Sequence, residues 1–417
     1  MGNDGSVERR PRIALVLSGG GARGAYEAGV LSYLVGDVSR RLSRPVHFDI
    51  ITGSSVGGVH ACYMAATQQD PGSGEALAEI WRSLSFEAVF PIGAADLVRL
   101  PWRLLGFGGA AMPPVAASEE LPQRLPALLD TRGLESLVLG RVPWPAIRRN
   151  LDEGQLDALA LTTTEVTTGR SVVFVDNANQ SLPQWARDPF IIGRSARIGP
   201  AHALASAAIP LLFPPVRIGQ SYYCDGGLRL NTPLAPALRL GADRVLIIGL
   251  RHRSTAEDEA RAARRPEANY MSLTYLAGKA LDALLLDRVE TDVDRLRLFN
   301  AILESGIQAY GPEFIDRINE PILALRNTSY RVVRDLYLTP SEDLSAIAAS
   351  CLLHQPRSGG IQSWLSRNIA RYVARGAVGE ADLLSYLFFD RCYADHLIAL
   401  GRHDAEQASD ELAAFLS

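Results

Sequence analysis

Lysine is almost missing from this chain of 417 residues: Lys279 is the only one, although lysine and arginine together number 42. Such a bias toward arginine is typical of a GC-rich bacterial coding sequence. Acidic residues outnumber basic ones and the formal net charge is −4, so the chain has no basic excess to neutralise phosphates. We therefore expect no nucleic-acid partner.

Cysteine is scarce and scattered. The four cysteines, Cys62, Cys224, Cys351 and Cys392, form no CxxC pair, so neither a zinc cluster nor a disulfide framework is predicted. This usage favours a reducing compartment. No acidic loop has the spacing of an EF-hand, so calcium is not expected either. The sequence predicts no metal and no cofactor.

Long hydrophobic runs are also missing. The first apolar run, residues 13–17, is too short for the core of a signal peptide. The longest one, residues 203–216, contains three prolines and is shorter than the roughly 20 residues that a membrane helix needs. We expect no signal peptide and no transmembrane helix, and a cytoplasmic location with at most peripheral contact with a membrane.

What the sequence does contain is an alternation of apolar strands and helices. A strand at 12–18 is followed by a glycine-rich turn and a helix at 25–34, and a strand at 48–52 by a turn and a helix at 59–66. Further strands are predicted at 159–163, 171–175, 216–218 and 245–250. This order predicts an α/β fold with a mostly parallel sheet between helices.

Changes in composition along the chain predict four segments. Residues 1–11 form a polar tail, 12–255 the α/β domain, and 256–269 a charged, alanine-rich linker. Residues 270–417 show mainly helical spacing, with one strand or hairpin near 331–338.

The turn after the first strand is unusually rich in glycine. Its residues are Gly19, Gly20, Gly21, Ala22, Arg23 and Gly24. Backbone N–H groups gathered at a helix start stabilise an oxyanion as well as a phosphate. For Arg23 we consider three roles: bonding the loop's carbonyls, adding positive potential, or lying exposed at the helix start.

The same turn satisfies the G-x-G-x-x-G pattern of dinucleotide-binding folds. Those folds need an acidic residue at the end of the second strand to hold the ribose, whereas here that strand runs into residues 52–54, Thr-Gly-Ser. The dinucleotide interpretation is therefore disfavoured.

A G-x-S-x-G pentapeptide follows the second strand. It consists of Gly53, Ser54, Ser55, Val56 and Gly57. Between a buried strand and an apolar helix, this pattern predicts a nucleophile elbow, in which small neighbours permit a strained turn that exposes the serine hydroxyl. Ser55 is the candidate nucleophile, and Ser54 lies one position off the pattern.

A serine nucleophile needs a base. None of the seven histidines lies in a small-residue turn or beside another catalytic-looking group. Asp225 precedes Gly226 and Gly227 after a predicted strand, and is the better candidate, although Asp-Gly-Gly also occurs as a plain turn. Burial would have to raise its pKa or align it closely with the serine.

In this order, the glycine turn at 19–24, the pentapeptide at 53–57 and Asp-Gly-Gly at 225–227 resemble the patatin-like phospholipase family. The resemblance extends from about Ile13 to Leu250. It implies a three-layer α/β/α sandwich with a mostly parallel central sheet that hydrolyses acyl esters of phospholipids and other lipids through an acyl-enzyme. It further implies a dyad of Ser55 and Asp225 without histidine, and an oxyanion hole made by the backbone of Gly20 and Gly21.

The region after about Tyr270 looks like the helical extension of some bacterial members. The implied partner is a phospholipid or another acyl lipid at a membrane surface, and no oligomeric state is predicted. Two alternatives remain open. One is an α/β-hydrolase esterase with a Ser–His–Asp triad, although Ser55 comes early for its elbow. The other is a non-catalytic lipid-binding or scaffold module.

Overall fold

The computed structural model describes residues 10–90, 130–182, 185, 188, 190–210, 212–253, 289–354 and 385–417. The predicted linker at 256–269 and residues 1–9 of the predicted tail at 1–11 lie outside these residues.

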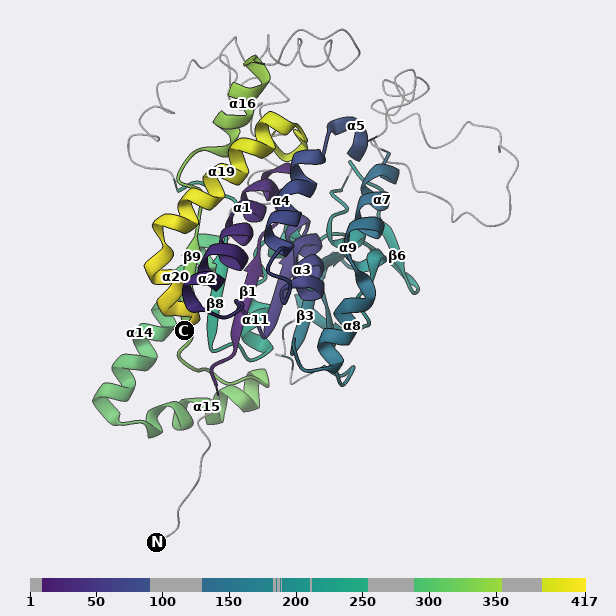
Figure 1. Cartoon of the computed structure of the whole chain (residues 1–417). Coiled ribbons are helices and arrows are strands. Elements are labelled where there is room, and N and C mark those ends of the chain that lie inside the picture. Colours follow the sequence, from purple (N-terminus) through teal and green to yellow (C-terminus); the bar gives the residue numbers. More distant parts are fainter. Residues whose placement is uncertain are drawn as a thin grey trace, which may run out of the picture.

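The strands form one sheet, and its centre is parallel (Figure 1). From edge to edge its order is β5 (Ile191–Ser195), β4 (Ser171–Asn177), β3 (Ala158–Glu165), β2 (Ile50–Ser54), β1 (Ile13–Leu17), β8 (Arg244–Ile248) and β9 (Arg334–Leu338). Strands β3, β2, β1, β8 and β9 run parallel, and β4 is antiparallel to β3. A hairpin of β6 (Val216–Ile218) and β7 (Ser221–Asp225) joins β3 through β7. The strands predicted from the sequence are confirmed.

Helices cover both faces of this sheet because both faces of its central strands are apolar (Figure 1). On one face, Leu15 and Leu17 of β1 pack with α1 (Gly24–Tyr33), α3 (Val56–Thr67), α4 (Ser73–Ser83) and α8 (Trp144–Asp152). On the other face, Ala14 and Val16 pack with α11 (Leu234–Arg239) and α14 (Val289–Tyr310). The expected three-layer α/β/α sandwich is confirmed.

The remaining described helices are short, apart from three in the C-terminal third. They are α2 (Ser39–Leu42), α5 (Phe86–Val89), α7 (Arg132–Arg141), α9 (Pro200–Ser206), α10 (Gly227–Leu230), α15 (Glu313–Arg326), α16 (Leu344–His354), α19 (Arg391–Gln407) and α20 (Ser409–Leu416). Among the helices described, none combines the length and apolarity required to cross a bilayer.

The described part of the C-terminal region packs directly on the α/β sandwich. Strand β9 extends the central sheet beside β8, and α19 lies along α1 (Figure 1). A Cβ atom on Gly29 of α1 would lie 2.3 Å from the carbonyl oxygen of Ile398 in α19. The two helices therefore approach as closely as glycine allows. The region is mainly helical, as expected, and its division from residues 12–255 stays a prediction.

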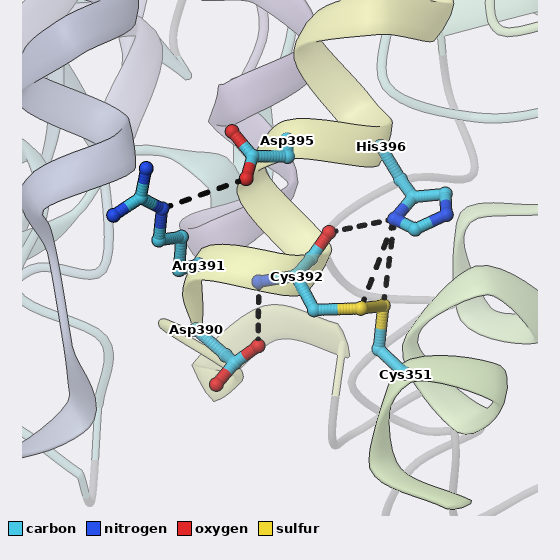
Figure 2. The surroundings of a disulfide bond; sticks show 6 residues. All are labelled: Cys351, Asp390, Arg391, Cys392, Asp395 and His396. Atoms are coloured by element: carbon cyan, nitrogen blue, oxygen red, sulfur yellow. Dashed lines mark hydrogen bonds and ion pairs between the residues drawn. A yellow bond between two sulfur atoms is a disulfide. The ribbon is translucent and has the colours of Figure 1, made fainter. Parts of the chain in front are cut away.

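A disulfide joins α16 to α19, which corrects the expectation that the cysteines stay unpaired (Figure 2). Cys351 and Cys392 have their Cα atoms 5.9 Å apart, whereas Cys62 and Cys224 are free and buried. The pairing could not be read from the sequence because the two cysteines are 41 positions apart and only tertiary packing brings them together. The disulfide also removes the basis on which a reducing compartment was expected.

Candidate active site

Ser55 lies in a strained turn between β2 and α3. Its backbone has φ 54° and ψ −128°, a conformation that a residue with a side chain rarely adopts. A Cβ atom on Gly53 would lie 2.2 Å from the carbonyl oxygen of Gly57, and one on Gly57 would lie 2.5 Å from that of Leu17. The two glycines of the pentapeptide are therefore required by the close packing of this turn.

Asp225 accepts a hydrogen bond from the hydroxyl of Ser55 at 2.6 Å, and both residues are buried. They are 170 positions apart in the chain. The sheet brings them together because Ser54 is in register with Thr162 of β3, and the next residue of β3, Thr163, is in register with Asp225 of β7. Strands β2 and β7 therefore pair with successive parts of β3, and Ser55 and Asp225 meet where the two pairings adjoin.

The carboxyl of Asp225 is fully buried and specifically held. Its Oδ1 accepts the N–H of Gly227 at 2.7 Å, while its own N–H donates to the carbonyl of Ala208 at 2.8 Å. Burial raises the pKa of this carboxyl to about 7, and the hydrogen bonds from Ser55 and Gly227 oppose that rise. A carboxyl with a pKa near neutrality can accept a proton at physiological pH.

The predicted glycine turn lies beside Ser55. A Cβ atom on Gly19 would lie 2.9 Å from that of Ser55, and the N–H of Gly19 donates to the carbonyl of Asn231. Neither the N–H of Gly20 nor that of Gly21 donates to another residue within the described ranges. Their role as an oxyanion hole stays a prediction.

The rest of the turn leads into α1. Gly21, with φ +57°, begins a 3₁₀ turn that includes Ala22 and Arg23, and Gly24 begins α1. A Cβ atom on Gly24 would lie 2.8 Å from the ring of Trp81, so this position also needs glycine. The pattern of glycines follows from these close contacts.

Arg23 is buried, which excludes an exposed position at the helix start. Its Nε donates to the hydroxyl of Ser385 at 2.8 Å and its Nη2 to that of Ser345 at 3.0 Å. Its guanidinium lies 4.3 Å from the ring centre of Tyr386. Arg23 therefore anchors the turn to residues of the C-terminal region.

An apolar pocket of about 100 Å³ lies beside Ser55 and Gly21. Its walls come from α3, α4, α5 and α7, and from Tyr386, Leu387 and Phe389; they include Val56 of the elbow. Aromatic rings contact one another along it: Phe90 stacks on Phe213 at 5.3 Å and meets Phe389 edge to face at 5.7 Å between ring centres. Its apolar lining suits a hydrocarbon chain.

His60 lines this pocket, but both of its ring nitrogens are occupied. Nδ1 is bonded to the carboxylate of Glu27 at 2.7 Å, and Nε2 accepts the indole N–H of Trp81 at 2.8 Å. Glu27 in turn accepts the N–H of Ser18 at 2.8 Å. The hydrogen bond of Ser55 goes directly to Asp225, with no imidazole between them.

Two supporting residues were not singled out from the sequence. Ser206 accepts the N–H of Ser55 at 3.0 Å and donates to the carbonyl of Thr162 at 2.7 Å, so it fixes the elbow to β3. Asn231 donates to the carbonyl of Gly19 at 3.2 Å. Both lie in stretches that resemble the family, but only the fold shows what they contact.

The other predicted site residues, Ser54, Gly226 and Gly227, support the structure around the dyad. Ser54 is buried, and its hydroxyl has no hydrogen-bond partner among the described residues. A Cβ atom on Gly226 would lie 2.3 Å from the carbonyl oxygen of Thr162, so the Asp-Gly-Gly turn needs glycine there. Gly227 contributes its N–H to Asp225.

The described residues place three potential metal ligands together, namely Cys351, Cys392 and His396. His396 Nδ1 lies 3.7 Å from each sulfur atom (Figure 2). The two sulfurs are bonded to each other, and a disulfide offers no thiolate to a metal. This group is far along the chain from the dyad.

The chain is similar to known proteins over its first half. A family model described as patatin-like phospholipase matches residues 15–238, more than half of the chain. A "cGAMP-activated phospholipase" from Escherichia coli (strain TW11681) is 27% identical over 243 residues, covering 55% of this chain and 56% of the relative. A protein of the same name from Pseudomonas aeruginosa (strain BWHPSA011 / Pa011) is 32% identical over 225 residues, covering 52% and 53%.

The chain thus spans about half the length of the curated relatives that it matches. Among solved structures, the crystal structure of VipD from Legionella pneumophila aligns with 91% of this chain and 67% of that chain, at 13% identity and a TM-score of 0.30. At this TM-score the likeness carries no argument.

Proposed function

Because the chain belongs to the patatin-like phospholipase family, we propose that it hydrolyses acyl esters of phospholipids or other lipids, with Ser55 as the nucleophile and Asp225 as the general base. The observation that carries this proposal is the buried hydrogen bond of 2.6 Å between the two side chains, together with the apolar pocket that Ser55 lines. The pocket suits the acyl chain, and the dyad suits the ester carbonyl.

In the first step, the carboxylate of Asp225 accepts the proton of Ser55 while the serine oxygen attacks the ester carbonyl. The pKa near 7 leaves a large fraction of the carboxyl ionised at neutral pH. It also makes the carboxylate a stronger base than an exposed aspartate would be. The leaving alcohol then takes the proton from Asp225.

The negative charge on the carbonyl oxygen needs donors that are fixed in advance. We assign this role to the N–H groups of Gly20 and Gly21, which have no partner within the described residues and lie at the start of α1. Preorganised donors of this kind are each worth about 10²–10³ in rate. Water then hydrolyses the acyl-enzyme through the same dyad.

The alternatives make different predictions. A Ser–His–Asp esterase would need an imidazole hydrogen-bonded to the hydroxyl of Ser55. Both ring nitrogens of His60 are instead hydrogen-bonded, to Glu27 and to Trp81. Replacing His60 by asparagine should therefore lower the free energy of unfolding while changing the rate of hydrolysis little. A lipid-binding module would bind lipid without releasing fatty acid. In that case the wild type would release no fatty acid, and Ser55→Ala would bind lipid as the wild type does.

The test is release of fatty acid from vesicles of a defined phospholipid by the full chain. Because both relatives are named as cGAMP-activated, the assay is run with and without cGAMP. We expect turnover by the wild type, and loss of turnover in Ser55→Ala and Asp225→Asn. Wild-type turnover that survives in either variant would overturn the proposal, as would no release under both conditions. Contact with a membrane surface stays a prediction, which sedimentation of the protein with the same vesicles tests.

A further inference from the structure

Residues 385–389 lie against the glycine turn, although the family match ends at residue 238. A Cβ atom on Gly21 would lie 2.3 Å from the carbonyl oxygen of Tyr386, so the backbone of Tyr386 packs directly on the turn. Tyr386 and Ser385 are both fully buried. A segment from the last tenth of the chain is therefore part of the wall around the predicted oxyanion hole.

Arg23 ties this segment to the turn. The guanidinium lies over the ring of Tyr386 and donates to the hydroxyl of Ser385, and it also reaches Ser345 in the first turn of α16. A cation–π contact in a desolvated setting is stronger than one at the surface. Arg23 directly follows Gly21 and Ala22 in the chain. Its contacts with Ser385, Ser345 and Tyr386 therefore hold the backbone of the glycine turn in place.

The same segment forms part of the acyl pocket. Tyr386, Leu387 and Phe389 line it, and the ring of Phe389 stacks on Trp81 at 6.0 Å between ring centres. Phe388 does not line it and instead packs near Tyr393 of α19, at 5.7 Å between ring centres. Adjacent phenylalanines thus have different surroundings, which provides a matched pair for mutation.

The chain directly after the segment is held in place. Asp390, which follows Phe389, caps α19 by accepting the N–H of Cys392 at 2.8 Å (Figure 2). Cys392 is bonded to Cys351 of α16, the helix that carries Ser345. Helix α19 packs along α1, which begins at the glycine turn. The segment therefore has a defined place beside the dyad.

We propose that residues 385–389 are a specificity and positioning element of the active site: Phe389 sets the room for the acyl chain, and Tyr386 positions the turn that carries the Gly20 and Gly21 amides. The part played by Tyr386 rests on the proposed hydrolase function. The part played by Phe389 needs only that the pocket binds an acyl chain.

The pocket is tested by binding of short, medium and long saturated fatty acids to the Ser55→Ala protein, so that no turnover is required. Adding Phe389→Ala should shift the preferred chain to a longer one, with the ratio of long-chain to short-chain affinity rising at least about fivefold. Phe389→Trp should shift it to a shorter one, and Phe388→Ala should leave it unchanged. An unchanged profile in both Phe389 variants, or equal shifts in Phe388→Ala, would overturn the assignment.

Positioning is tested by kinetics on one phospholipid. Tyr386→Leu removes the ring under Arg23 and should lower kcat about tenfold or more with little change in KM, because misplaced catalytic groups lose rate steeply. Tyr386→Phe keeps the ring and should restore kcat to within about twofold. Equal kcat in wild type and Tyr386→Leu would overturn the positioning role while leaving the proposed function intact. Turnover independent of Ser55 would instead refute the proposed function.

Discussion

A Cβ atom on Gly401 of α19 would lie 2.2 Å from the carbonyl oxygen of Tyr26 in α1, so these two helices pack backbone to backbone. The hydroxyl of Tyr26 donates to Asp404, one turn further along α19, at 3.0 Å. This contact fixes the C-terminal helix against the helix that begins at the glycine turn. The position of α19 therefore affects the position of the glycine turn as well as the stability of the protein.

Replacing Gly401 by alanine should destabilise the protein by about 1–3 kcal/mol, because overpacking outweighs the better helix propensity of alanine. Gly36→Ala is the control, since no atom lies within 4 Å of a Cβ atom placed there. The control should be neutral or slightly stabilising. Urea unfolding of the two variants measures the difference, and equal stabilities would refute the close packing.

The pH dependence of hydrolysis should follow the carboxyl of Asp225, whose pKa burial raises to about 7. Only the ionised form accepts the serine proton, so kcat/KM should fall about tenfold per pH unit well below that pKa and level off above it. Rates measured on one neutral substrate across this range test the assignment. A midpoint near 4, the value of an exposed aspartate, would contradict it.

The same carboxyl predicts the opposite trend for stability. Its pKa is higher in the folded state than in the unfolded state, so the folded protein holds the proton between about pH 4 and pH 7 and stability falls as pH rises through that range. Asp225→Asn cannot ionise. Above about pH 7 it should be more stable than wild type, by up to on the order of 4 kcal/mol, and the gain should vanish near pH 4. Denaturant unfolding at the two extremes measures it.

The two glycines of the predicted oxyanion hole should differ in their tolerance of alanine. Gly21 has φ +57°, and a Cβ atom there would meet the backbone of Tyr386, whereas one on Gly20 would meet the end of the Leu250 side chain. Gly21→Ala should therefore lower kcat by about 10²–10³, the range for losing one donor. Gly20→Ala should lower kcat less, because the side chain of Leu250 can move away from the added methyl group. Equal losses would show that backbone contact with Tyr386 is unimportant.

Breaking the disulfide between Cys351 and Cys392 should lower stability. In the chain-entropy model, cross-linking residues 41 apart is worth about 4 kcal/mol. Dithiothreitol should lower the Tm of wild type to that of Cys351→Ser/Cys392→Ser, and should leave the Tm of the double variant unchanged. A wild-type Tm that does not respond to the reductant would contradict the cross-link.

The local parts of this site could be predicted from the sequence. The elbow around Ser55 and the turn before Gly227 are short patterns whose glycines are required within a few residues, so their spacing is visible in the chain. A strand or hairpin was also predicted near 331–338, where β9 lies at Arg334–Leu338. That it pairs with β8 in the central sheet was not, because register depends on the whole fold.

Contacts between distant segments escaped prediction for the same reason. Arg23 could be assigned a role in the turn, but its partners Ser345, Ser385 and Tyr386 lie more than 300 positions away. Ser206 looks like any small residue in an alanine-rich helix until the fold places it under Ser55. Such partners are determined by tertiary packing.

Peptide mapping after reaction with a fluorophosphonate tests the central claim most directly. The reagent should modify Ser55 in the wild type and in Ser54→Ala, whose mutated residue is adjacent but off the pattern. It should modify Asp225→Asn at least about a hundredfold more slowly, because the serine then lacks its base. Modification at another residue, or equal rates in wild type and Asp225→Asn, would contradict a dyad of Ser55 and Asp225.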